Sequence, residues 1–167
     1  MNLDIELETP MIFLKPQLIK IEGFIVSGIH VRTKNSDELN PKTAKLPQLW
    51  QRFHTENIAN VVQNDPDSQQ FGVYSDYESD VSGAYTLTAG VKTDNVTRIP
   101  GCTSIYIEPG NYLLFQNHGS MPQAIIELWQ GIWRYFSFES RFVRRYLTDF
   151  EVYKNSEECA VYIGVVE

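Results

Sequence analysis

The 167-residue sequence has little cysteine, little histidine and no long apolar run. Its two cysteines, Cys102 and Cys159, lie far apart without a CxxC partner, so we expect reduced thiols rather than a disulfide. The three histidines lack metal-ligand spacing, and we predict neither a metal site nor a cofactor. No segment approaches the roughly 20 apolar residues that span a bilayer, and the N-terminus lacks a signal-peptide pattern. We therefore expect a cytoplasmic protein that does not contact a membrane.

Positive charge is also scarce. The formal net charge is −7 and the sequence pI is near 5.0. Because phosphate binding needs clustered Lys and Arg, we predict no direct binding to nucleic acid. The one basic cluster, from Arg141 to Arg145, contains three arginines interrupted by Phe142 and Val143, and we interpret it as a solvated face. An acidic chain with 13% aromatic residues is better suited to a hydrophobic or cationic small molecule.

What the sequence does contain is a pattern that recurs 79 residues later. Leu49-Trp50-Gln51 recurs as Leu128-Trp129-Gln130, and Phe71-Gly72-Val73-Tyr74 matches Phe150-Glu151-Val152-Tyr153 at the same offset. Two pairs of matches at one spacing indicate a structural unit that is used twice.

Each half has the signals of a β-α-β-β module. Apolar residues recur at helical spacing in both halves, which predicts long helices over about 45–61 and 120–136, and short alternating segments predict strands around them. We predict one domain over residues 1–167, with modules over about 17–92 and 102–167. Neither module can bury its sheet face alone. The predicted fold is therefore α+β, an antiparallel sheet with two long helices, pseudo-two-fold symmetry and a central ligand cleft.

Four short motifs occur in order between residues 17 and 166. They are Leu46-Pro47-x-Leu49-Trp50-x-x-Phe53, Phe71-Gly72-Val73-Tyr74-Ser75-Asp76, Ile107-Glu108-Pro109-Gly110-Asn111-Tyr112 and Asp149-Phe150-Glu151-x-Tyr153. Together they resemble the GyrI-like, or AraC-type, effector-binding domain. The resemblance implies a groove for hydrophobic, often cationic, compounds, in a family that includes drug-sensing regulators, gyrase-inhibitor-like proteins and some hydrolases. Regulators of that family also carry a helix-turn-helix domain, and we expect none here because the leader of about 16 residues is too short.

The acidic pocket residue of that family matches Glu151. The residues around it also favour a buried site, because Phe150, Val152 and Tyr153 are its neighbours and its repeat mate is Gly72, which leaves space. This arrangement predicts a cleft that is charged at one end and open at the other. A buried carboxylate needs a cation or hydrogen-bond donors, and an organic cation stacked on aromatic rings would supply the first.

Six aromatic residues are predicted to line the site with Glu151. Tyr74 and Tyr153 share its alternation phase along their strands. Trp50 and Trp129 lie on apolar helix faces, where core packing is an equal alternative, and Trp133 one turn later faces either the core or the cleft. Phe24 is included because of its place in the first strand region.

Three functions remain open from the sequence. The preferred one is a binding module that senses or sequesters hydrophobic cations. A hydrolase with Glu151 as acid or base is the second, although no GxSxG-type nucleophile motif is present and we assign no catalytic residue. The third is a protein-interaction module of the gyrase-inhibitor kind, with an unknown partner.

Overall fold

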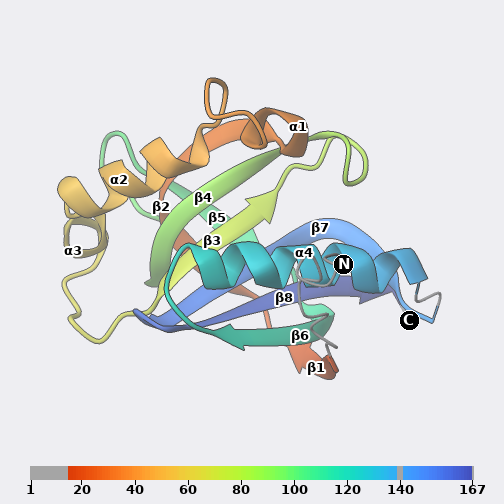
Figure 1. Ribbon diagram of the computed structural model, residues 1–167. Helices are drawn as coiled ribbons and strands as arrows, with labels where there is room; N and C mark the ends of the chain where they lie inside the picture. The colour runs from red at the N-terminus through yellow and green to blue at the C-terminus, as the bar shows by residue number, and fades with distance from the viewer. Residues whose placement is uncertain (1–14, 139–140, 167) are drawn as a thin grey trace.

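The computed structural model describes residues 15–138 and 141–166, which form eight strands and four helices (Figure 1). In chain order the elements are β1 (Gln17–Ile21), β2 (Phe24–Lys34), α1 (Asn35–Glu38), α2 (Leu46–Thr55), α3 (Ile58–Val62), β3 (Gln70–Ser75), β4 (Ala84–Thr93), β5 (Thr103–Ile107), β6 (Gly110–His118), α4 (Gln123–Phe138), β7 (Val143–Asn155) and β8 (Glu158–Val166). None of these helices is long and apolar enough to cross a membrane.

All eight strands belong to one antiparallel sheet in the order β1-β6-β8-β7-β3-β4-β2-β5. The order is symmetrical, because replacing each strand by its counterpart in the other half (β1 by β5, β2 by β6, β3 by β7, β4 by β8) reverses it. The predicted α+β fold with an antiparallel sheet is confirmed. The centre of symmetry lies between β3 and β7, where Gly72 pairs with Glu151.

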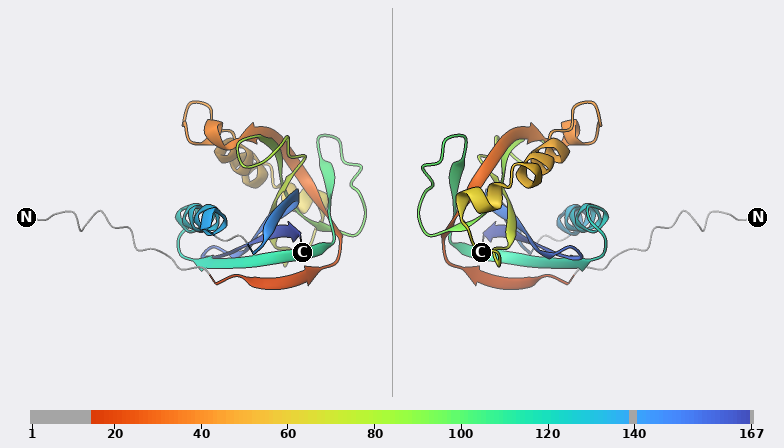
Figure 2. Two further views of the ribbon diagram at one scale, coloured as in Figure 1. Left: turned by 90° about the vertical axis from the view of Figure 1, so that its right-hand side faces the viewer. Right: turned by 90° about the vertical axis from the view of Figure 1, so that its left-hand side faces the viewer.

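Each half contributes one strand to the edge of the other half. β1 pairs with β6 over Gln17–Ile21, and β5 pairs with β2 over Thr103–Ile107. Before its helix each module is predicted to have one extended region, with a bend or bulge at Gly23 in the first and a break at Pro109-Gly110 in the second. The structure divides that region in two, at Glu22-Gly23 in the first half and at Glu108-Pro109 in the second. The sheet curves strongly, with β1 and β6 forming one side of the bend and β2 the other (Figure 2).

The helices α2 and α4 cover the same face of the sheet (Figures 1 and 2). Their apolar stripes place Leu49 and Phe53 of α2, and Leu128 and Ile132 of α4, in the larger hydrophobic cluster. A smaller cluster that includes Phe150 occupies the opposite face. The period-2 alternation of the strands explains both clusters, since it sends successive side chains to opposite faces.

The first predicted helix is interrupted in the structure. We predicted one helix over 45–61, but α2 ends at Thr55 and α3 begins at Ile58. Between them Asn57 adopts a left-handed conformation with φ of 54°, which an α-helix does not accommodate. The second helix begins at Gln123, three residues after the predicted start, and continues to Phe138.

Candidate ligand-binding site

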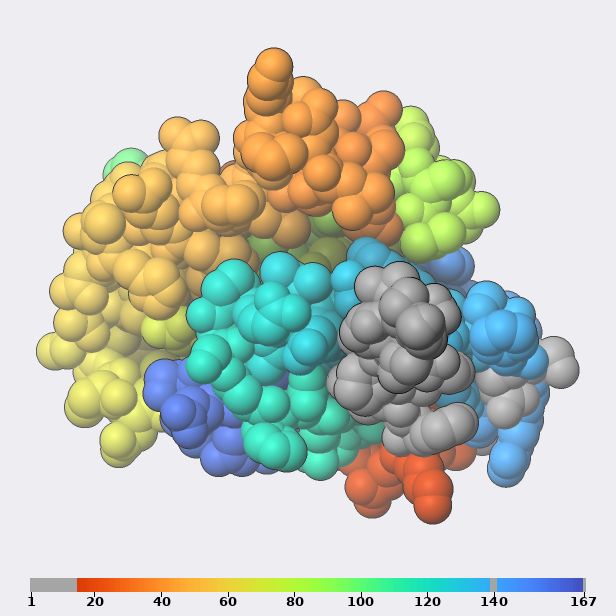
Figure 3. Space-filling model, viewed as in Figure 1, coloured from red at the N-terminus to blue at the C-terminus, as the bar shows by residue number. Residues whose placement is uncertain are grey.

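A cavity of about 1040 Å³ opens on the helix-covered face of the sheet, between α2 and α4. The space-filling view shows the surface hollowed between the orange atoms of α1 and α2 and the teal atoms of α4 (Figure 3). The structure brings six of the seven predicted site residues to its wall. They are Trp50, Tyr74, Trp129, Trp133, Glu151 and Tyr153.

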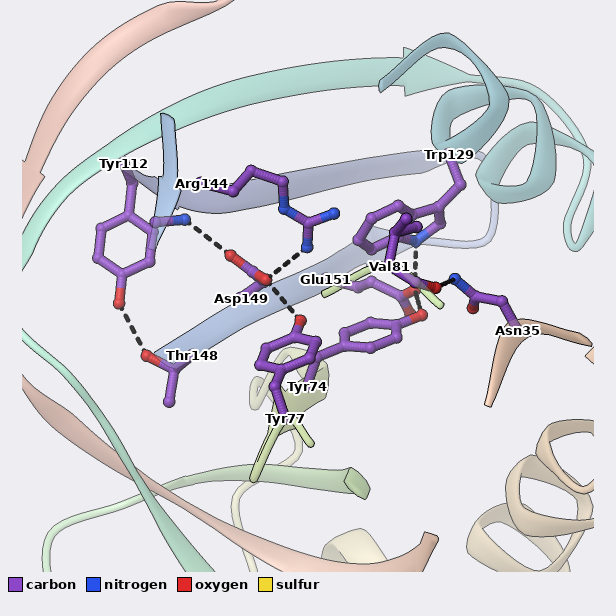
Figure 4. A network of polar contacts seen from close by, with 11 residues as sticks. Asn35, Tyr74, Tyr77, Val81, Tyr112, Trp129, Arg144, Thr148, Asp149 and Glu151 are labelled. Atoms are coloured by element: carbon purple, nitrogen blue, oxygen red, sulfur yellow. Dashed lines mark hydrogen bonds and ion pairs between the residues drawn. The ribbon is translucent and has the colours of Figure 1, made fainter. Parts of the chain in front are cut away.

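Glu151 lies at the base of this cavity with only 3% of its surface exposed. Its Oε2 accepts hydrogen bonds from the Tyr74 hydroxyl at 2.6 Å and from the Trp129 indole N–H at 2.7 Å. Its Oε1 accepts one from the Tyr153 hydroxyl at 2.7 Å. Tyr74, Trp129 and Glu151 converge from three elements, β3, α4 and β7 (Figure 4). Residues predicted to stack on a ligand therefore also act as donors to the carboxylate.

In the part of the chain that the structure describes, no cation forms an ion pair with Glu151. Among the described residues the ion pairs are Arg52–Glu56 and Arg144–Asp149, and neither includes Glu151. Burial raises the pKa of the Glu151 carboxyl above its ordinary value, against the opposing effect of its three hydrogen bonds. Among the described residues the carboxylate is satisfied by neutral donors alone, although it is almost fully buried.

The two tyrosines that bond to Glu151 are held in their neutral form. Burial, and then the neighbouring Glu151, raise the pKa of Tyr74 and of Tyr153 well above the ordinary value. Both hydroxyls consequently remain hydrogen-bond donors throughout the physiological pH range.

Gly72 lies directly opposite Glu151 on the neighbouring strand. A Cβ at Gly72 would lie 2.8 Å from Glu151 Oε1 and 3.1 Å from Trp50 Cζ2. The space that the glycine leaves is therefore filled by the Glu151 carboxyl group. The predicted cleft with a charged end and an open end is wrong in this respect, because the repeat mates meet at the centre of the sheet.

The three tryptophans have different surroundings. Trp129 is 8% exposed, and its ring centroid lies 5.0 Å from that of Tyr74. Trp50 is half-buried and makes an edge contact with Tyr153 at 5.4 Å between centroids. Trp133 is 37% exposed and lies 6.0 Å from Trp129, so it faces the cavity from its outer part.

Phe24 is the predicted site residue that the structure does not bring to the cavity. It begins β2 and makes edge contacts with Phe71 at 5.6 Å and with Phe150 at 5.5 Å. Both partners belong to the smaller cluster on the opposite face of the sheet. The sequence placed Phe24 in the first strand region but did not reveal which face it occupies.

A second polar group beside the cavity was missed from the sequence, the pair of Asp149 and Arg144, of which Arg144 lines the cavity. Asp149 is fully buried, and its Oδ2 accepts from Arg144 Nη2 at 2.8 Å and from the Tyr77 hydroxyl. The expected solvated face is wrong for Arg144, whose side chain is 8% exposed, and Arg145 donates to the Pro109 carbonyl at 2.9 Å. Asp149 shares the alternation phase of Glu151, which could have revealed it. Arg144 gave no such signal, because the strand is irregular between the two residues.

Comparison with known proteins gives consistent matches along the chain. The profile of Cass2, the integron-associated effector binding protein family, matches residues 17–165. An integron cassette protein from the mobile metagenome of Vibrio cholerae is 34% identical, with a TM-score of 0.81 over 92% of this chain and 98% of that one. The Bacillus subtilis (strain 168) putative transcriptional regulator protein YobU is 26% identical over 130 residues, 76% of this chain and 79% of its own length.

A more distant match shares the fold. SAV2435, solved bound to tetraphenylphosphonium, is 17% identical with a TM-score of 0.70, over 91% of this chain and 94% of that one. The family profile and the Vibrio cholerae relative extend over nearly all of the described residues, and they confirm the effector-binding resemblance of the four motifs. The chain belongs to the Cass2 family of integron-associated effector-binding proteins.

Proposed function

We propose that this protein senses or sequesters hydrophobic organic cations, which bind in the cavity with their positive centre beside Glu151. One observation carries the proposal. Glu151 is a buried carboxylate in the wall of a large cavity, and its hydrogen-bond partners are all neutral. A carboxylate removed from water is costly unless a cation or donors satisfy it, and a ligand cation would add the missing charge.

The walls of the cavity fit the rest of such a ligand. Trp50, Trp129, Trp133 and Tyr153 present aromatic rings, which attract cations through the negative face of the ring and apolar groups through burial. A volume of about 1040 Å³ is at the upper end of the range for drug-sized ligands. These features favour a bulky aromatic cation over a small polar one.

The relatives support the same class of ligand. Membership of an effector-binding family is consistent with small-molecule binding. SAV2435, which shares the fold, was solved with tetraphenylphosphonium, a lipophilic cation without hydrogen-bond donors. A site that recognises such a cation must rely on charge and ring contacts, and this chain offers both.

A titration with a cation and its neutral isostere tests the proposal. We expect 4-(trimethylammonio)biphenyl to bind more tightly than 4-tert-butylbiphenyl, which has the same shape without the charge. Glu151→Gln should weaken binding of the cation by ~1–3 kcal/mol, about five- to 150-fold in affinity, and leave the affinity for the neutral compound almost unchanged. The change in tryptophan fluorescence on binding would give both affinities.

Asp80→Asn is the matched control, because Asp80 is a carboxylate in the cavity wall but is exposed and bonded to Ser82. We expect it to change cation affinity less than twofold, since exposed charges are screened. Equal affinities of wild type and Glu151→Gln for the cation would refute the proposal. If wild type hydrolysed a bound ligand and Glu151→Gln abolished this hydrolysis, a hydrolase would be supported instead.

A further inference from the structure

A buried ion pair lies close to Glu151, and its arginine, Arg144, lines the cavity. Asp149 precedes Glu151 by two residues on β7, so both side chains leave the same face of the strand, roughly 7 Å apart. Asp149 is neutralised by Arg144, at 2.8 Å, and its other oxygen accepts the Gly164 backbone N–H at 2.7 Å. Of this pair, Arg144 is the member that lines the same cavity as Glu151, so a ligand there would meet the guanidinium rather than the Asp149 carboxylate (Figure 4).

A bulge in β7 places Arg144 at this position. The register of β7 against β8 shifts between Arg144 and Asp149, and within the shift Tyr146 has a φ of 53°, in the left-handed region. Such a conformation persists in a non-glycine residue when the surroundings hold it, and bulges commonly redirect side chains next to binding sites. Here the Tyr146 ring lies 4.4 Å from the Arg144 guanidinium and 5.3 Å from Tyr77.

The guanidinium retains unused capacity to donate. Of the five N–H groups that an arginine carries, the one hydrogen bond to a described residue is that from Nη2 to Asp149. The buried Nε has no partner among the residues that the structure describes. Figure 4 shows the other terminal nitrogen turned away from Asp149. Because Asp149 is already paired and Arg144 is the member of the pair that lines the cavity, a ligand cation at this end would meet the guanidinium and would find no free carboxylate.

We propose that the cavity is two-ended and selects aromatic ligands that carry a cationic centre at one end and a hydrogen-bond acceptor, such as a carboxylate, at the other. The cationic centre would lie beside Glu151 and the acceptor beside Arg144. Arg144 is then a specificity-determining residue. It should raise the affinity for a ligand with an acceptor at this end and lower the affinity for a ligand with a second positive charge. This inference rests on the proposed function, because the cationic end of the ligand is the part that Glu151 would hold.

Three ligands built on one scaffold test it. They are 4-(trimethylammonio)biphenyl with hydrogen, a carboxylate or a second trimethylammonium at the 4′ position. For wild type we expect the carboxylate to bind roughly tenfold more tightly than the parent, and the dication roughly tenfold more weakly, as expected for a charge-assisted hydrogen bond and a like-charge contact. Equal affinities for the three ligands would overturn the inference.

Variants of the ion pair assign the preference to Arg144. Arg144→Met should abolish the gain from the carboxylate and favour the dication, because Asp149 is then unpaired. Since that variant leaves a buried charge and is at risk of misfolding, Arg144→Met/Asp149→Asn removes the pair together and should bind all three ligands within about threefold. Arg144→Lys keeps the positive charge and should keep the order of affinities. A double variant that retained the wild-type order would overturn the inference.

Glu151→Gln separates this inference from the proposed function. If both hold, it weakens all three ligands by a similar factor and preserves their order. If Glu151→Gln lowers the three affinities but wild type binds the three ligands equally well, the cation site is supported and the two-ended cavity is wrong. If it changes none of the affinities, the proposed function fails, and the two-ended site fails with it.

Discussion

At the scale of single residues, the contact between Gly72 and Glu151 decides how the centre of the sheet packs. A Cβ at Gly72 would lie 2.8 Å from Glu151 Oε1, closer than side chains approach. Gly72→Ala should therefore displace the carboxyl group and strain its hydrogen bonds to Tyr74 and Trp129. We expect a loss of about 1–3 kcal/mol in the free energy of unfolding, typical of overpacking, and weaker cation binding.

Urea unfolding of a double-mutant cycle checks this explanation. In a Glu151→Ala background the carboxyl group is absent, so adding Gly72→Ala should cost less than it does in wild type. If Gly72→Ala lowered the free energy of unfolding equally in both backgrounds, the added methyl group would not be clashing with the Glu151 carboxyl group.

Glu151 should also make cation binding depend on pH. Burial raises the pKa of this carboxyl above the ordinary 4.5. Its protonated form is favoured in the folded protein, so its contribution to stability is full below pH 4.5 and is lost as pH rises through the raised pKa. A bound cation favours the ionised form and reverses the effect. Cation affinity should fall as pH decreases through the raised pKa, approaching about tenfold per pH unit.

Calorimetric titrations with the biphenyl cation between pH 8 and pH 4 would record this fall. In Glu151→Gln the same titrations should give a nearly flat profile. A parallel fall in both proteins would assign the pH dependence to another group.

The sequence predicts which residues surround Glu151 better than what they do. The alternation phase correctly placed Tyr74 and Tyr153 on its face of the sheet. Their hydroxyls bond to Glu151 because three elements converge there, and a linear pattern does not contain that convergence. Phe24 and Arg144 were misplaced for related reasons. One begins a strand after a corner and the other precedes a bulge, and at such positions the sequence does not reveal which face the side chain occupies.

At the scale of elements, the break between α2 and α3 depends on one residue. The apolar stripe continues through Ile58 and Val62, which is why the sequence predicts a single helix. Asn57, with φ of 54°, ends α2 instead. Asn tolerates this conformation better than most residues because its short polar side chain bonds locally, and glycine tolerates it best.

Substitutions at Asn57 should follow that order. Asn57→Gly should leave the free energy of unfolding within about 0.5 kcal/mol of wild type, whereas Asn57→Val should lower it by about 1–2 kcal/mol. Denaturant titrations followed by circular dichroism would measure both. If Val were tolerated as well as Gly, the left-handed backbone at this position would not be required by the fold.

At the scale of the whole molecule, the two halves share their edge strands. The 79-residue repeat in the sequence predicts the two similar halves. It does not predict that β1 pairs with β6 and β5 with β2, because short apolar strands carry no signal that identifies their partner. The exchange means that the sheet of either half is incomplete without a strand from the other. The central pairing of β3 with β7 joins them as well.

A chain divided in the segment between β4 and β5 should therefore fold only when both parts are present. We expect fragments 1–95 and 96–167 to show no cooperative unfolding alone, and to recover it, together with cation binding, when mixed in equal amounts. Near-ultraviolet circular dichroism and size-exclusion chromatography would follow the association. A fragment that unfolded cooperatively as a monomer would contradict the dependence on exchanged strands.

The centre of the sheet should also favour the mixed pair over two copies of one fragment. Gly72 and Glu151 occupy equivalent positions on either side of the symmetry axis and face each other. In a homodimer of fragment 96–167 two Glu151 carboxylates would meet there, a buried like-charge pair that opposes ionisation. In a homodimer of fragment 1–95 two glycines would meet and leave a void. Lowering the pH should accordingly promote self-association of fragment 96–167, whereas Glu151→Gln in that fragment should promote it at neutral pH.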